Sequence, residues 1–314
     1  MTTNCQALFQ QIHADISDKY IMGNREFIDH LVVAFLARGH VLIEGPPGTA
    51  KTMTAKLLAE ILSKSFKRIQ FTTDMLPSDI IGAHIYSPAK QQFQFIPGPI
   101  FSDVILADEI NRTPPRTQSA LLEAMEERQV TVEGTRYPLS QDFFVLATQN
   151  PREFEGTFPL PEAQMDRFLF KLVLKPSDAA TEVKILKNIL NGTLPPPFGT
   201  FKQPVIDRPT IDGEIQGVKI DDSLINYVAK ILDGLRKHPM LTWGASTRGG
   251  IAIVKCAQIY AVLQGRDLVI PDDIKRLTTV SLRHRLKLSP DAMISNVTED
   301  EVIMQVLEKV AFPT

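Results

Sequence analysis

Apolar and polar positions in the first half of the chain follow two different periods. Apolar residues recur at helical spacing over residues 5–20, 24–37, 52–62 and 117–127. Shorter runs at residues 41–43, 67–71, 104–107 and 143–147 have the composition of strands. Strands and helices that alternate along a chain predict a parallel sheet covered by helices.

Two segments interrupt this alternation, and each has the pattern of a β-hairpin. The first covers residues 83–97, where Phe93 and Phe95 alternate with glutamine before a Pro-Gly-Pro turn. The second covers residues 129–139 and turns at Glu133-Gly134. We expect both hairpins to project from the sheet as insertions.

The second half of the chain has a different pattern. Residues 168–174 resemble a last strand, and Ser177 is a suitable N-cap for a helix that reaches residue 190. Proline and glycine are frequent over residues 191–219, where we expect little regular structure. Helical periodicity then returns at residues 222–237, 246–263, 271–286 and 299–310. The chain therefore divides into an α/β domain over residues 1–176 and a helical domain over residues 177–314.

Composition limits the partners and the cellular location that we expect for the protein. The 34 Lys and Arg residues balance 36 Asp and Glu residues, so the net charge of -2 provides no general attraction to nucleic acid or anionic lipid. Cys5 and Cys256 form no metal-binding pattern, which favours reduced thiols and a cytoplasmic location. The first 20 residues lack the pattern of a signal peptide, and no apolar run approaches the roughly 20 residues of a membrane span. We expect a soluble protein.

The strongest chemical signal is the loop that follows residues 41–43, which is Gly45-Pro46-Pro47-Gly48-Thr49-Ala50-Lys51-Thr52. Its glycines let backbone N–H groups turn toward an anion, and the helix that follows adds its positive end. Lys51 can reach the β- and γ-phosphates of a nucleotide, and the Thr52 hydroxyl can bind Mg²⁺. Ala50 departs from the usual pattern, which has glycine before the lysine. The alternative is a simple Gly/Pro turn, but the strand and helix around the loop favour a phosphate site.

Polar residues follow two other apolar strands. Asp108 and Glu109 end the strand over residues 104–107, as in a Walker B motif, where Asp108 would hold Mg²⁺ through water and Glu109 would polarise the attacking water. Asn150 closes the strand over residues 143–147, where its amide could position the same water. Each group could instead belong to a solvated turn, and the phosphate loop is what favours the catalytic reading.

Two arginines are further candidates. Arg167 lies between Asp166 and Phe168 at the start of the last strand, and Arg248 lies at the start of a helix in the second domain. Either could contact phosphate. Arginines form structural ion pairs more often than they contact phosphate, so the position of these two residues in the sequence does not decide between the two roles.

Taken together, these segments resemble the MoxR family of AAA+ ATPases over nearly the whole chain. The resemblance rests on five stretches, at residues 45–52, 107–112, 120–128, 147–151 and 160–168, which read GPPGTAKT, ADEINR, ALLEAMEER, ATQNP and LPEAQMDRF. It implies an AAA+ P-loop core, a parallel sheet with flanking helices and two β-hairpin inserts, followed by a small all-α lid domain.

The resemblance also implies roles for individual residues. Ala50 is usual in this family, Asn150 is the sensor-1 residue, Arg248 is sensor 2, and Arg167 is an arginine finger that reaches the ATP of a neighbouring subunit. Arg152 and Arg112 are rival fingers. A finger that acts on a neighbour requires a homo-oligomer, which in this family is a hexameric ring.

The same resemblance extends to ligands and partners. Met22 and Gly23, within Tyr20-Ile21-Met22-Gly23, resemble the segment that cradles adenine, although core packing explains Ile21 and Met22 equally well. The hairpins imply a surface that faces the pore or a substrate, where Phe93 and Phe95 could move, although alternating aromatics are more often half-buried strand residues. Typical partners in this family carry a von Willebrand factor A domain.

The leading hypothesis is therefore an ATPase that uses ATP and Mg²⁺ and acts as a chaperone or activator of other proteins. A nucleic-acid motor of the same AAA+ branch is an alternative, but the second hairpin has Arg136 and no basic cluster, whereas tracking a nucleic-acid backbone needs a basic groove. A slow nucleotide-dependent switch is a third hypothesis. Glu109 separates the switch from the ATPase, because Glu109→Gln should nearly abolish rapid turnover.

Overall fold

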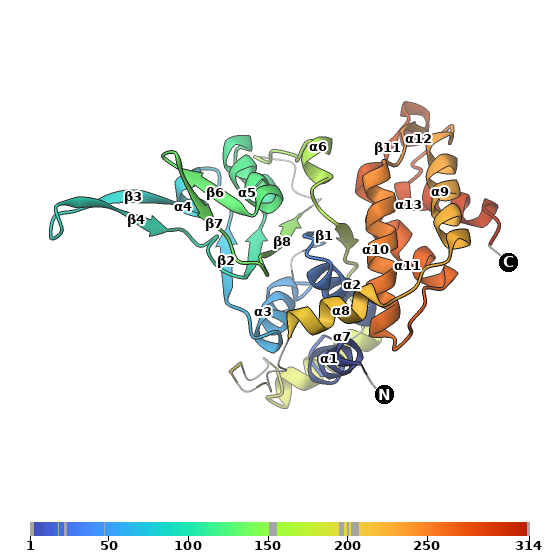
Figure 1. Ribbon diagram of the computed structural model, residues 1–314, viewed down its shortest axis with the longest axis horizontal. Helices are drawn as coiled ribbons and strands as arrows, with labels where there is room; N and C mark the ends of the chain where they lie inside the picture. Colours follow the sequence, from blue (N-terminus) through green and yellow to red (C-terminus); the bar gives the residue numbers. More distant parts are fainter. Residues whose placement is uncertain are drawn as a thin grey trace.

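The computed structural model shows an α/β domain beside a helical domain (Figure 1). It describes residues 3–17, 19–21, 24–46, 48–150, 156–194, 198–199, 201 and 207–312. None of the described helices combines the length and apolar composition needed to cross a lipid bilayer.

The first domain is built on a parallel sheet, as the alternation of strands and helices predicts. Its strands are β1 (Val41–Glu44), β2 (Phe66–Gln70), β5 (Val104–Asp108), β8 (Phe144–Gln149) and β9 (Phe170–Val173). Their spatial order is β2-β5-β8-β1-β9, and every described pairing between them is parallel. The carboxyl ends of these strands therefore share one edge of the sheet, and their amino ends share the opposite edge.

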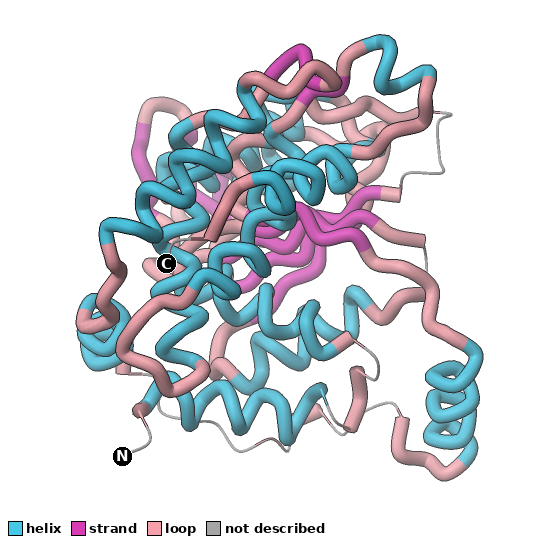
Figure 2. Tube along the Cα trace, turned by 90° about the vertical axis from the view of Figure 1, so that its right-hand side faces the viewer, coloured by secondary structure: helices cyan, strands magenta, loops and turns pink. Residues whose placement is uncertain are grey.

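Helices cover both faces of this sheet (Figure 2). Alternate side chains of a strand point to opposite faces, so Val104 and Leu106 of β5 belong to one apolar cluster and Ile105 and Ala107 to another. The first cluster includes α2 (Arg25–Leu36) and α3 (Lys51–Ile61), and the second includes α5 (Pro115–Glu127). Burial on both faces explains why the central strands β5 and β8 are apolar over most of their length, whereas the edge strand β2 contains Lys67 and Arg68.

Both expected hairpins are present. The first is β3 (Gly82–Ser87) paired with β4 (Gln92–Pro97), and it follows the short helix α4 (Pro77–Ile81). The second is β6 (Gln129–Val132) paired with β7 (Thr135–Pro138). The β3–β4 hairpin extends far from the body of the domain (Figure 1). Phe95 of this hairpin stacks on Tyr137 of the other, with ring centroids 4.0 Å apart, so the two insertions form one unit at their base.

The second domain is a group of helices with one small sheet. Its main helices are α9 (Asp222–Arg236), α10 (Thr247–Leu263), α11 (Pro271–Leu282) and α13 (Glu299–Lys309). Shorter elements are a 3₁₀ turn, η3 (Arg283–Arg285), the helix α12 (Pro290–Ile294), and the strands β10 (Leu241–Trp243) and β11 (Lys287–Leu288). This domain is the helical lid that the sequence predicts, with one addition, a short antiparallel pairing of β10 with β11.

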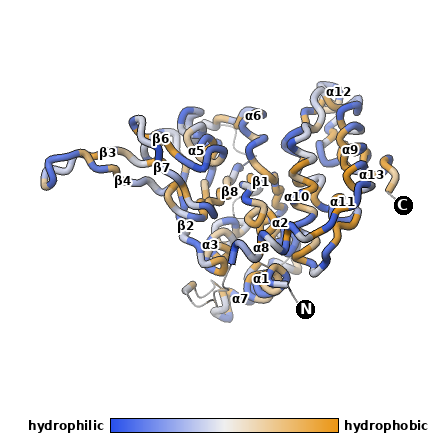
Figure 3. Tube along the Cα trace, in the orientation of Figure 1, coloured by the Kyte–Doolittle hydropathy of each residue, from blue (hydrophilic) through white to orange (hydrophobic). Residues whose placement is uncertain are grey.

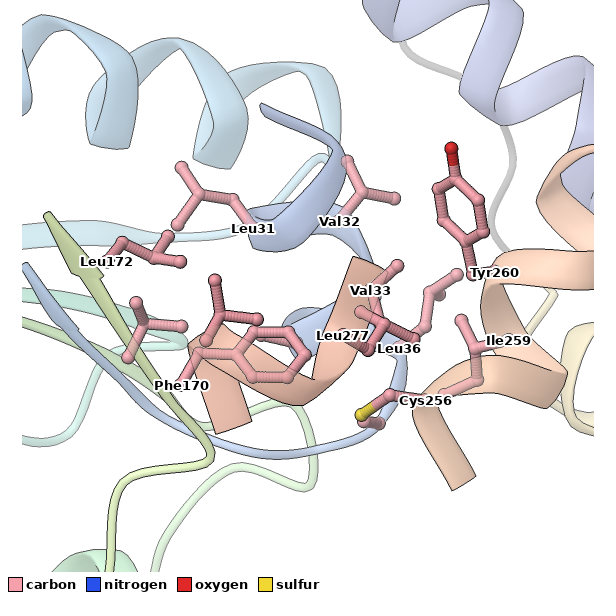
Figure 4. Close-up of a cluster of buried hydrophobic side chains, with 14 of the residues drawn as sticks. Leu31, Val32, Val33, Leu36, Phe170, Leu172, Cys256, Ile259, Tyr260 and Leu277 are labelled. Carbon is pink, nitrogen blue, oxygen red and sulfur yellow. The ribbon is translucent and has the colours of Figure 1, made fainter. Parts of the chain in front are cut away.

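Apolar side chains join the two domains. Val33 and Leu36 of α2 lie between Phe170 of β9 and Ile259 of α10, beside Leu277 of α11 (Figure 4). Apolar and polar residues alternate along α2, α10 and α11 (Figure 3), and buried apolar side chains of all three belong to one cluster. The edge strand β9, the helix α2 and the lid helices therefore share one apolar core, and this packing determines the position of the lid relative to the sheet.

Several expected boundaries differ from those observed. The first helix ends at Ile12 as α1 (Asn4–Ile12) and continues as a π-helical turn, η1 (His13–Ser17). Another 3₁₀ turn, η2 (Ile110–Arg112), follows β5, and α6 (Glu162–Met165) precedes β9. The helix expected after Ser177 is α7 (Ala179–Leu190), and its N-cap is Asp178, whose side chain accepts a hydrogen bond from the Thr181 N–H. Ser177 is therefore not the cap.

One helix lies where little regular structure is expected. It is α8 (Arg208–Gln216), which Asp207 caps by accepting a hydrogen bond from the Thr210 N–H. Its Glu214 carboxylate accepts hydrogen bonds from the backbone of Asn4 and Cys5 at 2.8 and 2.9 Å. The helix has a weak apolar stripe and depends on these distant contacts, which periodicity cannot reveal.

The division between the domains at residue 176 stays a prediction.

Candidate functional site

The phosphate loop leaves the carboxyl end of β1, which lies inside the sheet between β8 and β9. Gly48 has a φ of +83°, a conformation that glycine adopts without strain. At Gly45 a Cβ atom would lie 3.0 Å from the Leu174 Cβ, so only glycine fits against the end of β9 without displacement. Ala50 has a φ of +58° just before α3, which is the left-handed position where the usual pattern has glycine.

Lys51 folds back over this loop. Its Nζ donates hydrogen bonds to the Gly45 and Pro46 carbonyl oxygens at 2.7 and 3.1 Å. Partial burial lowers the pKa of Lys51, and the attraction of Asp108 and Glu109 opposes that shift. The ammonium group thus lines a cavity that is also lined by two carboxylates, where it can bind a polyanion.

This cavity has a volume of about 460 Å³ and lies at the carboxyl edge of the sheet. Most of the residues expected to bind or act on ATP line it. These are Gly48, Thr49, Ala50, Lys51, Thr52, Asp108, Glu109 and Asn150. The structure therefore brings together the ends of β1, β5 and β8, as parallel strands require. Pro47, Met22, Gly23 and Arg152 lie outside the described residues.

Asp108 and Glu109 are both engaged by neighbouring side chains. Asp108 accepts hydrogen bonds from Arg68, with Nε at 3.1 Å and the terminal nitrogen at 2.6 Å. Glu109 accepts one from Gln70 at 2.8 Å and forms an ion pair with Arg112 at 3.1 Å. Glu109 also has a φ of +59°, an uncommon backbone conformation for glutamate that is frequent at functional sites.

Thr148 connects these two acidic residues to the strand that carries Asn150. Its hydroxyl donates a hydrogen bond to Asp108 Oδ1 at 2.6 Å and accepts one from the Glu109 N–H at 2.9 Å. Thr148 and Arg68 are absent from the sequence-based site. Thr148 stands two residues before Asn150, and Arg68 is a basic residue on the strand beside β5, but neither position reveals its partner without the strand order.

Oxygen donors suitable for Mg²⁺ are present in this cavity. The Thr52 hydroxyl and the Asp108 carboxylate both line it, and hard cations prefer such oxygen ligands. The residues present therefore fit a magnesium ion bound together with nucleotide phosphates.

Arg167 and Arg248 lie elsewhere. They line a second cavity of about 330 Å³, which shares no lining residue with the first. Arg167 precedes β9, and Gly39 and His40 of the same cavity precede β1, so this cavity lies at the amino edge of the sheet. The length of β1, about 13 Å at 3.3 Å per residue, separates the two edges. Neither arginine faces the phosphate loop of its own chain.

Both arginines are paired with carboxylates in this second cavity. Arg167 Nε lies 3.1 Å from Glu126 Oε2, and Arg248 lies 3.0 Å from Asp166 Oδ2. Arg112, a rival finger, instead contacts the catalytic-carboxylate candidate Glu109 of its own chain. Of the described arginine candidates, Arg167 and Arg248 are thus the two that stand away from their own phosphate loop.

A third cavity, of about 440 Å³, lies beside the phosphate loop between the two domains. It is lined by Asn24 and His30 of the N-terminal part, by Leu172–Leu174 at the end of β9, and by Lys275 and Arg276 of α11. Burial lowers the pKa of His30 to about 4, so this side chain is neutral at pH 7. Asn24, which lines this cavity, follows Gly23 directly in the sequence.

Known families match the two halves of the chain. Residues 40–170 match the ATPase family associated with various cellular activities (AAA), and residues 234–306 match the AAA lid domain. A crystal structure of a protein from Cytophaga hutchinsonii superimposes with a TM-score of 0.87 at 38% identity, covering 99% of this chain and 97% of that one.

Several relatives are similar over most of their length. Uncharacterized protein YeaC of Bacillus subtilis is 45% identical, covering 94% of this chain and 92% of its own. Chaperone MoxR1 of Mycobacterium tuberculosis is 39% identical, with 94% and 80% covered. Protein MoxR of Methylorubrum extorquens is 30% identical, with 87% and 85% covered.

Proposed function

The chain belongs to the MoxR family of AAA+ ATPases, and on this premise we propose that it hydrolyses ATP with Mg²⁺ as a ring of identical subunits that remodels partner proteins. Each ATP would lie at an interface between two subunits. One subunit would contribute the phosphate loop and the acidic residues, and its neighbour would contribute the arginines. The opposite placement of these two groups in one chain is the observation that carries the proposal.

The phosphate-loop half of the site supplies binding and general-base chemistry. Lys51 would exchange its two loop carbonyls for phosphate oxygens, which are stronger acceptors because they are charged. Glu109 would polarise the attacking water, and Asn150 would orient that water from the neighbouring strand. Mg²⁺, held by Thr52 and Asp108, would neutralise charge on the phosphates. The adenosine would occupy the cavity between β9 and α11.

The arginine half supplies positive charge to the transferred phosphoryl group. Arg167 and Arg248 lie at the amino edge of the sheet, whereas the phosphates lie at the carboxyl edge. A head-to-tail arrangement of subunits places the amino edge of one chain against the carboxyl edge of the next, and closes into a ring when the rotation permits. An arginine supplied in this way accelerates hydrolysis by about 10³–10⁵ in other nucleotide hydrolases. We propose that Arg248 acts on the neighbour's ATP together with Arg167.

The two hairpins are the proposed contact with partner proteins. Phe93 is 69% exposed, whereas Phe95 is held against Tyr137 and links the hairpins to each other. The β6–β7 hairpin follows α5 and precedes β8, which contains Thr148 and is followed directly by Asn150. A shift of β8 with nucleotide state would therefore move both hairpins. Typical partners would be proteins with a von Willebrand factor A domain, and the proposed location is the cytoplasm.

A mixing experiment tests the shared site. Lys51→Ala and Arg167→Ala chains should each be nearly inactive, and a mixture of the two should regain part of the ATPase rate, because some interfaces then join an intact loop to an intact arginine. A mixture of Lys51→Ala with the Lys51→Ala, Arg167→Ala double variant is the control, since it contains no intact loop. If the first mixture forms mixed rings and stays as inactive as the control, Arg167 does not act on the neighbour.

The slow switch remains the second candidate, because hydrogen bonds and ion pairs already engage both acidic residues. The two functions differ in turnover. In the ATPase, Glu109→Gln should lower kcat by at least 10² while ATP still binds, whereas a switch with slow turnover in the native chain would show little change.

A further inference from the structure

One carboxylate in the amino-edge cavity lies between the two arginines proposed to act on the neighbouring subunit. Glu126 stands near the end of α5, with Oε2 at 3.1 Å from Arg167 Nε and Oε1 at 3.9 Å from a terminal nitrogen of Arg248. Arg167 belongs to the α/β domain and Arg248 to the lid. Glu126 therefore pairs with a cation from each domain at the same time.

The second carboxylate of this cavity has a different setting. Asp166 pairs with Arg248, but it is also held by Arg285, whose Nε lies 2.6 Å from Asp166 Oδ1. The Arg285 side chain is only 4% exposed, and it also donates to the Phe168 carbonyl oxygen. Loss of this partner would leave the nearly buried guanidinium group of Arg285 without its carboxylate, so the fold holds Asp166 in place.

The remaining basic residues of the cavity are occupied by other groups. Lys255 donates to the Ala37 carbonyl oxygen at 2.7 Å, and Arg128 donates to the carbonyl oxygens of Gln141 and Phe143 at 3.3 Å. Arg38 pairs with Asp212 of α8 at 2.7 Å. Among the described cations of this cavity, Arg167 and Arg248 are the two that Glu126 pairs with.

The pairs that Glu126 forms are weak enough to exchange. The side chain of Glu126 is 44% exposed, and those of Arg167 and Arg248 are 29% and 57% exposed. Partly exposed ion pairs contribute little because water screens them. A triphosphate carries more negative charge than one carboxylate and accepts paired hydrogen bonds from a guanidinium group, so it competes well for the same arginines.

We propose that Glu126 is a positioning residue that holds Arg167 and Arg248 as an internal anion until the ATP of the neighbouring subunit replaces it. This inference rests on the proposed function, in which both arginines act on the neighbour. The exchange releases Arg167 of the core and removes one of the two carboxylate partners of Arg248 in the lid, which keeps Asp166 as its other partner. It therefore links ATP binding in one subunit to the contact between core and lid in the next. Glu126 thereby raises the ATP concentration at which the ring becomes active.

Removal of the charge at position 126 tests this role. Glu126→Gln should lower KM for ATP about two- to fivefold and should not lower kcat, because the competing anion is lost while the arginines remain. The difference should shrink at high ionic strength, which screens partly exposed charges. Glu127→Gln is the matched control, since Glu127 is an exposed residue next to Glu126 on the same helix. Glu126→Ala should give the same shift if the glutamine variant assembles poorly.

Mixed rings locate the effect on one side of the interface. Glu126→Gln is placed either in the Lys51→Ala chain, which supplies the working arginines, or in the Arg167→Ala chain, which supplies the working loop. Only the first placement should lower KM. An equal shift from both placements, or a lower kcat with unchanged KM, would overturn the inference. If the parent mixture without the Glu126 substitution regains no activity, the shared site itself is refuted.

Discussion

Replacing Thr148 with valine removes the hydroxyl that joins Asp108 to Glu109. Thr148 is 1% exposed, so no water replaces its hydrogen bonds. A hydrogen bond to a charged group contributes about 1.5–3 kcal/mol, and a buried amide left without a partner costs about 1–3 kcal/mol. Since valine recovers some apolar contact, Thr148→Val should lower the free energy of unfolding by about 2–4 kcal/mol. The apparent affinity for Mg²⁺ in the ATPase reaction should fall about 10-fold, as it does when outer-shell partners of a metal ligand are lost.

Urea unfolding and a Mg²⁺ titration of the ATPase rate measure the two effects. Thr148→Ser is the control, because it keeps the hydroxyl and loses one methyl group, which costs about 1 kcal/mol. The valine variant should therefore be less stable than the serine variant. Equal stability of the two variants, with unchanged Mg²⁺ dependence, would refute the view that the hydroxyl organises the acidic pair.

Three further predictions concern single residues. Ala50→Gly removes the strain of an alanine in the left-handed conformation but makes the unfolded chain more flexible, so the two effects oppose each other. The free energy of unfolding should change by less than about 1 kcal/mol and ATPase activity should be retained. A loss of activity would contradict this. Arg285→Ala should cost about 1.5–3 kcal/mol, because it removes the hydrogen bonds of a nearly buried guanidinium group to Asp166 and to the Phe168 carbonyl oxygen. Arg248→Ala should cost less than about 1 kcal/mol, because its ion pairs are partly exposed, and similar thermal shifts for the two variants would be contrary. Burial lowers the pKa of His40 from 6.5 to about 3. As pH falls below 6.5, His40 therefore becomes protonated in the unfolded chain but stays neutral in the folded chain. The free energy of unfolding should consequently decrease toward pH 4. His40→Gln should reduce this slope in urea titrations at several pH values, and an unchanged slope would exclude His40 as a source.

Local patterns were sufficient for most of the α/β domain. The strands that become β1, β5 and β8 are short apolar runs with burial on both faces, and the phosphate loop combines glycine, lysine and threonine at fixed spacing. Such features depend on neighbours in sequence, so the fold class, both hairpins and the loop residues and carboxylates that line the carboxyl-edge cavity could be predicted, whereas Arg68 and Thr148 of that cavity could not. The helix α8 and the small β10–β11 sheet could not, because they depend on contacts with distant segments.

The sequence by itself determined which residues are available for chemistry, since a loop such as residues 45–52 carries its function in its own backbone and side chains. Tertiary structure decided which of those residues meet. The strand order β2-β5-β8-β1-β9 brings Arg68 and Thr148 to Asp108 from the two strands beside β5. The parallel direction of β1 and β9 places Arg167 at the edge opposite Lys51, and the lid adds Arg248 beside it. Strand order and direction arise from packing of the whole domain, and they place the phosphate loop and these two arginines at opposite edges of the same sheet.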